Sequence, residues 1–85
     1  MPMTRARYAR NFFAKIVGDT GERVLNKVRK SIGVVTIACS IASGYDVEVQ
    51  PYNTLDTYAG NAKSLRAALL IALKQWRAVE EAADE

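Results

Sequence analysis

Basic side chains of the kind that bind phosphates gather in the first third of this chain. Residues 1–30 contain eight Lys and Arg residues against two acids, which gives this segment a net charge of +6. Such a cluster is typical of surfaces that bind nucleic acid or an acidic protein, and equally of a solvated face that keeps a small protein soluble. The residues that we expect to contact a partner are Arg5, Arg7, Arg10, Arg23, Lys27 and Lys30.

Acidic side chains form a second candidate site. Asp46 and Glu48 lie in a segment that alternates polar and apolar residues, so both project from the same side of a predicted strand. Neighbouring carboxylates can act as general acid and base, but this requires a shifted pKa, and no apolar wall around them is evident. Either these acids lie on a solvated strand face, or, as a site, they contact a basic patch on a partner protein.

The residue types that most enzymes and metal sites require are missing. The chain has no histidine, the commonest general base and metal ligand, and its one cysteine cannot form a thiolate zinc site. Neither a Walker loop nor a dinucleotide-binding glycine motif is present. We therefore expect a non-enzymatic protein without cofactor or metal. The single Cys39 excludes an internal disulfide, fits a reducing cytoplasm, and is expected to be a small core residue.

Length and composition indicate one small globular domain that spans residues 1–85. Apolar residues make up 49% of the chain and charged residues 25%, which is ordinary for a folded protein. A core of this size rarely contributes more than about 3–5 kcal/mol, so a partner or self-association is a reasonable expectation. No apolar run reaches the roughly 18 residues of a membrane span, and no signal-peptide core follows the N-terminus. We expect a cytoplasmic protein without a membrane partner.

Three amphipathic helices are predicted by the spacing of apolar residues, over residues 5–17, 20–31 and 61–82. Thr4 can cap the first helix and Asp19 the second, where Glu22 follows three residues later as in a capping box. Trp76 lies on the stripe of the last helix and is expected in the core, or as an interface anchor if half exposed. Core packing is also expected, rather than stacking on bases, for Tyr8, Phe12 and Phe13.

Residues 32–52 are predicted to form a β-hairpin. The second arm alternates strictly, and a two-residue loop would set its charged residues opposite apolar ones on the first arm. We therefore predict a three-residue loop, Ala42–Gly44, that ends in a glycine. This register pairs Ile41 with Tyr45, Cys39 with Val47 and Ile37 with Val49. Residues 53–60 are expected to form a loop.

These elements predict an α+β fold with the order α-α-β-β-α. A two-stranded sheet is marginal in water unless helices cover it, so the first and last helices are expected to lie on its apolar face. At least one strand edge stays open, and a second copy can pair with it into a four-stranded sheet and a homodimer. The apolar face is expected to consist of Ile37, Cys39, Ile41, Tyr45, Val47 and Val49.

The absence of catalytic groups favours a small protein that binds a protein partner, such as an inhibitor or adaptor of a nucleic-acid-handling complex. In size and style the chain is comparable to small phage- or mobile-element-encoded inhibitors, including those that block CRISPR complexes, although it shares no motif with them. The alternative is a nucleic-acid-binding module that uses the basic N-terminal helices. Their outline matches a helix-turn-helix only loosely, since the second helix offers few side chains that would read bases.

Overall fold

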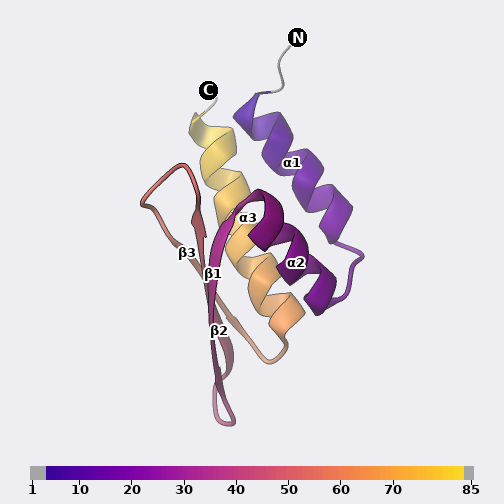
Figure 1. Cartoon of the computed structure of the whole chain (residues 1–85), viewed down its shortest axis with the longest axis vertical. Coiled ribbons are helices and arrows are strands. Elements are labelled where there is room, and N and C mark those ends of the chain that lie inside the picture. The colour runs from indigo at the N-terminus through magenta and orange to yellow at the C-terminus, as the bar shows by residue number, and fades with distance from the viewer. Residues whose placement is uncertain (1–3, 84–85) are drawn as a thin grey trace.

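The computed structural model describes residues 4–83, which form three helices and an antiparallel sheet of three strands in the order β1-β2-β3 (Figure 1). The elements are α1 (Arg5–Ile16), α2 (Gly21–Ser31), β1 (Gly33–Ser40), β2 (Gly44–Pro51), β3 (Tyr58–Ala62) and α3 (Leu65–Ala83). The predicted α+β class is confirmed, and a third strand extends the predicted order to α-α-β-β-β-α.

Threonine side chains cap the first two helices. The Thr4 hydroxyl accepts a hydrogen bond from the Arg7 amide at 3.2 Å, as predicted, and so satisfies one of the free donors at the start of α1. The predicted cap of α2 at Asp19 is wrong by one residue, because the Thr20 hydroxyl accepts from the Arg23 amide at 3.3 Å. The Asp19 carboxylate instead pairs with Lys27 at 2.6 Å.

The β1–β2 hairpin has the predicted faces but a different register. Val35 pairs with Val49 and Ile37 with Val47, so the predicted pairing is wrong by two residues, which keeps every side chain on its predicted face. The turn consists of residues 41–43, and Gly44 begins β2 with a φ of 81° instead of ending the turn. Gly44 also lies against β3, where a Cβ would come within 2.5 Å of the Ala62 carbonyl oxygen.

The strand β3 replaces the end of the predicted loop 53–60. It pairs with β2 from Tyr45↔Ala62 to Val49↔Tyr58, and α3 begins only after it, at Leu65 rather than at residue 61. Gly60 lets β3 approach α3 closely, since a Cβ there would overlap the Ala68 carbonyl oxygen and lie 2.9 Å from the Ala72 amide nitrogen. An Ala-Gly-Asn-Ala sequence has low strand propensity, so packing on α3 and pairing with β2 determine this strand.

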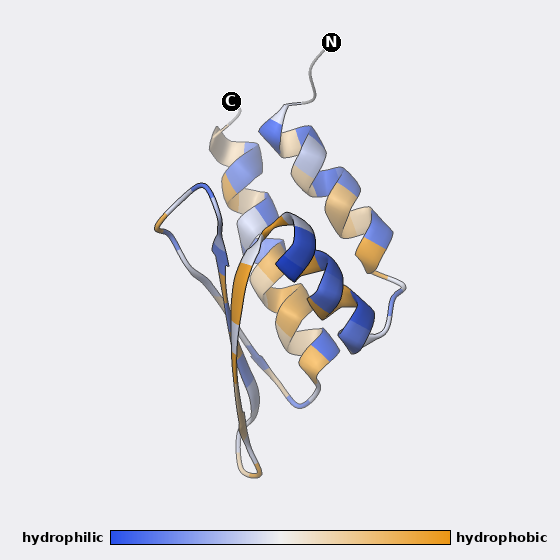
Figure 2. Ribbon diagram, viewed as in Figure 1, coloured by the Kyte–Doolittle hydropathy of each residue, from blue (hydrophilic) through white to orange (hydrophobic). Residues whose placement is uncertain are grey.

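The molecule is built in layers, with α2 and α3 on one face of the sheet (Figure 1). The prediction that the first helix covers the hairpin is wrong, because α1 packs on α3 and touches α2 instead of the sheet. Figure 2 shows hydrophobic turns of α3 behind α2 and hydrophilic turns on the outward side of α2. The largest fully buried side chains are Ile16, Val24, Val28, Val47, Val49, Leu69 and Leu73.

The tip of the hairpin projects past the helices (Figure 1). Two predicted core residues are therefore exposed: Cys39 on β1 and Ile41 in the turn, whose relative exposure is 109%. The prediction placed both residues on the helix-facing side correctly, but no helix reaches that far along the strands. Ile37 and Tyr45 are only partly buried for the same reason.

Candidate functional site

Two adjoining hollows run between the helices. The larger, of about 440 Å³, lies between the start of α1, the end of α2 and α3, and is lined by Tyr8, Tyr52 and Trp76 among others. The second, of about 290 Å³, lies between α1 and α2 and is lined by Phe12, Lys15 and Lys27. Tyr8 and Ser31 line both, so the hollows meet. We call them together the helical groove.

Aromatic rings form one wall of the helical groove. The Trp76 ring meets the rings of Tyr8 and Phe12 edge-on, with centroid distances of 6.5 and 6.0 Å. Trp76 is 4% exposed, which confirms it as a core residue and not an interface anchor. Phe12 and Phe13 are partly buried, whereas Tyr8 is 42% exposed. The Tyr8 ring therefore offers an apolar surface that is held rigidly by the rings beneath it.

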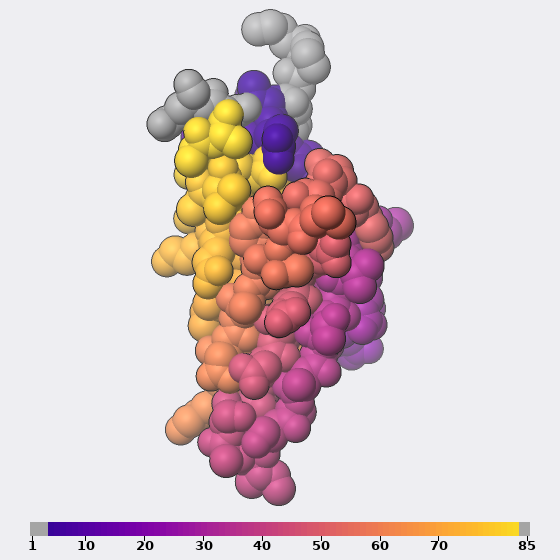
Figure 3. Space-filling view, turned by 90° about the vertical axis from the view of Figure 1, so that its left-hand side faces the viewer, coloured from indigo at the N-terminus to yellow at the C-terminus, as the bar shows by residue number. Residues whose placement is uncertain are grey.

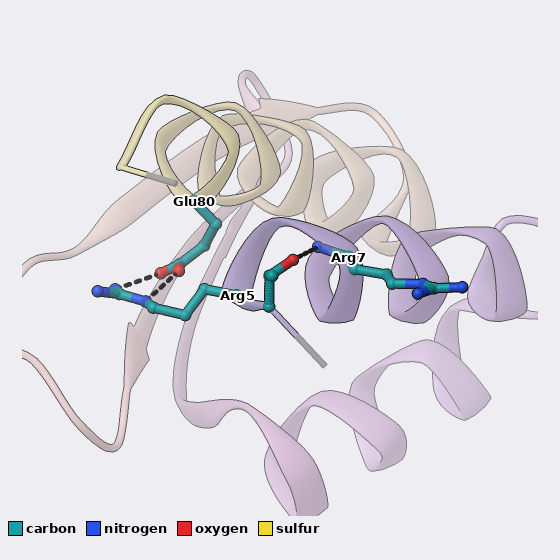
Figure 4. Close-up of polar contacts among 4 residues, drawn as sticks. Arg5, Arg7 and Glu80 are labelled. Atoms are coloured by element: carbon teal, nitrogen blue, oxygen red, sulfur yellow. Dashed lines mark hydrogen bonds and ion pairs between the residues drawn. The ribbon is translucent and has the colours of Figure 1, made fainter. Parts of the chain in front are cut away.

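Two residues that line the larger hollow, Arg5 and Glu80, form an internal ion pair. Figure 4 shows this pair. Arg5 donates two hydrogen bonds to the Glu80 carboxylate, at 2.6 and 2.9 Å, and thereby joins the start of α1 to the end of α3. Glu80 is 6% exposed and is the one buried charged residue in the described part of the chain. Arg5 was predicted to contact a partner, but its first role is to satisfy a carboxylate that would otherwise be buried alone.

The remaining predicted basic contacts differ in how far they are neutralised. Arg10 lies 3.6 Å from Glu81, and Lys27 lies 2.6 Å from Asp19. No acidic side chain between residues 4 and 83 is within ion-pair distance of Arg7, Arg23 or Lys30. In Figure 4 the Arg7 side chain points away from the Arg5–Glu80 pair.

The exposed side of α2 carries three of these cations. Arg23, Lys27 and Lys30 follow one another at helical spacing, so they form one stripe, which we call the α2 basic stripe. Lys27 belongs to both the stripe and the lining of the helical groove. The stripe therefore reaches the aromatic-lined hollow through Lys27, whose charge Asp19 partly offsets.

The acidic candidates lie elsewhere. Asp46 and Glu48 are exposed on the helix-free face of the sheet, which Figure 3 shows as an uncovered surface of strand residues. Asp46 accepts a hydrogen bond from the Asn61 side chain at 2.6 Å. The structure does not bring these acids together with the basic residues. The acids lie on the sheet and the basic residues on α1 and α2, so the predicted site residues form two separate surfaces.

Two further residues, neither of them predicted, hold α1 and α2 in place by bonds to backbone carbonyls. Arg66, near the start of α3, donates to the Asp19 carbonyl at 2.9 Å and also to the Val17 carbonyl, so it fixes the α1–α2 connection on α3. The Tyr52 hydroxyl donates to the Arg29 carbonyl at 2.5 Å and fixes the end of α2 beside the larger hollow. Neither residue stands in a periodic pattern, so the sequence contains no signal for either contact.

Burial and charge act on one tyrosine next to the Arg5–Glu80 pair. Burial raises the pKa of the Tyr58 hydroxyl above its ordinary value of 10.0, and the negative charges of Asp56 and Glu80 add to this effect. The positive charge of Arg5 acts in the opposite direction. Tyr58 therefore stays protonated and neutral beside the buried carboxylate at physiological pH.

The described residues contain no group of three or more His, Cys, Asp or Glu side chains that would hold a metal ion. Between residues 4 and 83, no helix has both the length and the apolar character needed to cross a membrane. No protein-family model, curated protein or solved structure matches this chain. The helical groove and the α2 basic stripe beside it form the candidate binding surface.

Proposed function

We propose that this protein is a small non-enzymatic binding protein that holds an acidic segment of a protein partner in the helical groove. The observation that carries the proposal is that the exposed Tyr8 ring lines the second hollow together with Lys15 and Lys27. No acidic side chain between residues 4 and 83 lies within ion-pair distance of Lys15, whereas Asp19 offsets part of the charge of Lys27. An aromatic surface flanked by cations fits a chain that presents an apolar side chain between carboxylates. Such a role agrees with an inhibitor or adaptor of a nucleic-acid-handling complex.

The distribution of charge favours a protein over nucleic acid as the ligand. Phosphate binding gains affinity from each cation that releases a counterion, and a cation with an internal acidic partner contributes less. Arg5, Arg10 and Lys27 each have such a partner. Of the cations in the first third that have no acidic partner between residues 4 and 83, only Lys15 lines the groove, where it lies beside the aromatic wall, as polar groups lie around the apolar centre of a protein interface.

Nucleic-acid binding is kept as the second candidate because Arg23 and Lys30 lie on one exposed stripe without an acidic partner among residues 4–83. This candidate predicts contact with the backbone only, with affinity that falls steeply as salt rises. It also predicts that the aromatic wall contributes little.

A fluorescence titration separates the two candidates, because the chain has a single tryptophan and Trp76 lies in the wall of the helical groove. The titrants are a peptide of alternating glutamate and phenylalanine and a single-stranded oligonucleotide of equal charge. We expect the peptide to change the Trp76 emission and to bind more tightly than the oligonucleotide.

Two variants assign the binding energy. Tyr8→Ser should weaken peptide binding by roughly tenfold, since an exposed aromatic anchor typically contributes more than about 1 kcal/mol. The double variant Arg23→Ala/Lys30→Ala is compared with Lys63→Ala/Lys74→Ala, which removes the same charge from exposed positions outside the groove. If oligonucleotide binding is the tighter, and Tyr8→Ser leaves both affinities unchanged, the second candidate replaces the first.

A further inference from the structure

The outer edge of β1 is an unpaired strand edge. The sheet order β1-β2-β3 leaves β1 with a neighbour on one side only. Its eight residues, Gly33–Ser40, include no charged residue and no proline. Charges, prolines and bulges are the usual means by which proteins keep such an edge from pairing, so this edge lacks the usual protection.

The backbone groups on this edge can be assigned from one hydrogen bond. The Tyr52 amide donates to the Ile32 carbonyl at 2.9 Å, so even-numbered residues of the first strand direct their backbone groups toward β2. The odd-numbered residues from Gly33 to Cys39 then direct theirs outward. No other group in the described part of the chain bonds to these outward donors and acceptors.

The other edge of the sheet is protected, in contrast. β3 is only five residues long and lies against α3. The Gln75 side chain of α3 donates to the Ala59 carbonyl at 3.0 Å and so occupies an acceptor on the outer side of β3. The two edges therefore differ, and β1 is the edge that is available for pairing.

Apolar side chains along β1 also remain uncovered. On the helix-facing side of this strand Val35 is buried, Ile37 is partly buried and Cys39 is exposed, while Ile41 in the turn is fully exposed. The first half of β1 is thus covered by α2, and the second half is uncovered. An antiparallel copy of the same strand would place its uncovered half beside the covered half, next to α2.

From these observations we infer that β1 pairs with β1 of a second copy, antiparallel, so that the two sheets form one sheet of six strands. Outward backbone groups must face one another, which requires odd residues opposite odd residues. The register centred on Ile37 meets this requirement. It sets Val35 opposite Cys39 and Gly33 opposite Ile41 of the other copy, so every uncovered apolar residue gains an uncharged neighbour.

The occupant is a second copy because the strand is complementary to itself. Two-fold pairing juxtaposes no charges along β1, and the acids of the sheet, Asp46 and Glu48, lie on β2, one strand away from the new junction. Pairing with a strand of a different protein would not require β1 to be complementary to itself. The inference is independent of the helical groove, which lies on α1, α2 and α3.

A matched pair of variants tests the pairing. Cys39→Pro removes an outward amide donor and leaves the β1–β2 hydrogen bonds intact, whereas Cys39→Ser removes the thiol and keeps the donor. In sedimentation equilibrium we expect the wild type and Cys39→Ser to reach twice the monomer mass of 9.4 kDa. Cys39→Pro should remain at the monomer mass with an unchanged far-ultraviolet circular dichroism spectrum.

Disulfide trapping tests the register. Directly opposed residues of a hydrogen-bonded antiparallel pair are about 5.5 Å apart at Cα, within the range that a disulfide spans. Ile37→Cys in the Cys39→Ser background should form a covalent dimer on oxidation. Asn61→Cys on the β3 edge, in the same background, should not.

Three results would overturn the inference. One is a wild-type chain that stays at the monomer mass at every concentration and gains mass only when a foreign protein is added. Another is a dimer that Cys39→Pro does not weaken. The third is covalent trapping at Asn61 in place of Ile37, which would assign association to the opposite edge of the sheet.

Discussion

Removing Arg5 is predicted to destabilise the fold, although the Arg5 side chain is more than half exposed. Arg5→Ala leaves the Glu80 carboxylate without its two charged donors, which lie at 2.6 and 2.9 Å. Exposed ion pairs typically contribute about 0.2–1 kcal/mol, whereas breaking a buried pair costs about 3–5 kcal/mol. The Arg5 side chain is 59% exposed and that of Glu80 only 8%.

The pair lies between these limits, and solvent screening on the Arg5 side lowers the cost. We therefore expect Arg5→Ala to reduce the free energy of unfolding by about 1–2 kcal/mol. For a domain of this length, that corresponds to a fall in Tm of about 5–12 °C. The measurement is urea unfolding followed by Trp76 fluorescence, with thermal melts as a second readout.

Arg10→Ala is a control matched in exposure. Its side chain is 60% exposed, nearly the same as that of Arg5, but its partner Glu81 is 39% exposed and 3.6 Å away. We expect this variant to cost less than about 0.5 kcal/mol. The double variant Arg5→Ala/Glu80→Gln should recover part of the loss, because no charge is then left buried. Equal costs for Arg5→Ala and Arg10→Ala, with no recovery in the double variant, would show that Arg5 does not stabilise the fold by neutralising Glu80.

Three further predictions concern Gly60, Tyr58 and Arg66, which lie outside the helical groove. Gly60→Ala should cost about 1–3 kcal/mol in urea unfolding, because its Cβ would strike the α3 backbone, while Gly18→Ala, with nothing within 4 Å, should be nearly neutral; equal effects would contradict the close approach. Because the pKa of Tyr58 is raised in the folded protein, Tyr58 ionises above pH 10.0 in the unfolded chain before it ionises in the folded one, and the free energy of unfolding falls as pH rises through this range. Tyr58→Phe should remove this part of the alkaline loss of stability. Parallel curves of unfolding free energy against pH for the variant and the wild type would count against it. Arg66→Ala should cost about 1–2 kcal/mol, and Arg66→Lys should not restore it, since one ammonium cannot reproduce a planar fork that bonds two carbonyls; full rescue by lysine would disprove that role.

Much of the fold was predictable from local patterns. The period of two along β2 identified which residues face the helices, because that assignment depends only on alternation. The helical stripes predicted α1, α2 and α3 for the same reason. Gly44 was predicted correctly as the left-handed residue of the hairpin, but the register depended on whether Gly44 ends the loop or begins β2 opposite Ser40. Its close approach to β3 involves a strand outside the hairpin.

Neither β3 nor the Arg5–Glu80 ion pair could be predicted from local sequence patterns. β3 has a sequence with little strand propensity, and its pairing with β2 and packing on α3 become visible only in three dimensions. Arg5 and Glu80 are separated by 75 residues in the chain, so the charge count of the N-terminal third overstated the charge that is available to a partner. Cys39 and Ile41 were assigned to the correct face, but the length of the helices leaves them exposed.

The predicted basic contact residues therefore differ in whether an acidic residue of the same chain neutralises them. Arg5 has a structural role, Arg10 and Lys27 are partly neutralised, and Arg23 and Lys30 are exposed without an acidic partner in the range 4–83. A mutation series that treats them as equivalent would mix loss of stability with loss of binding. Each binding measurement on a basic variant should accordingly be paired with its unfolding curve.

Amide chemical-shift mapping can show whether the helical groove receives an acidic segment of a protein. The labelled protein is titrated with the glutamate–phenylalanine peptide used in the fluorescence experiment. We expect the shifts to concentrate on residues 8–15 of α1 and 27–31 of α2, with Asp46 and Glu48 unmoved. Shifts that concentrate on the helix-free face of the sheet, or that spread evenly over all exposed cations including Lys63 and Lys74, would contradict it.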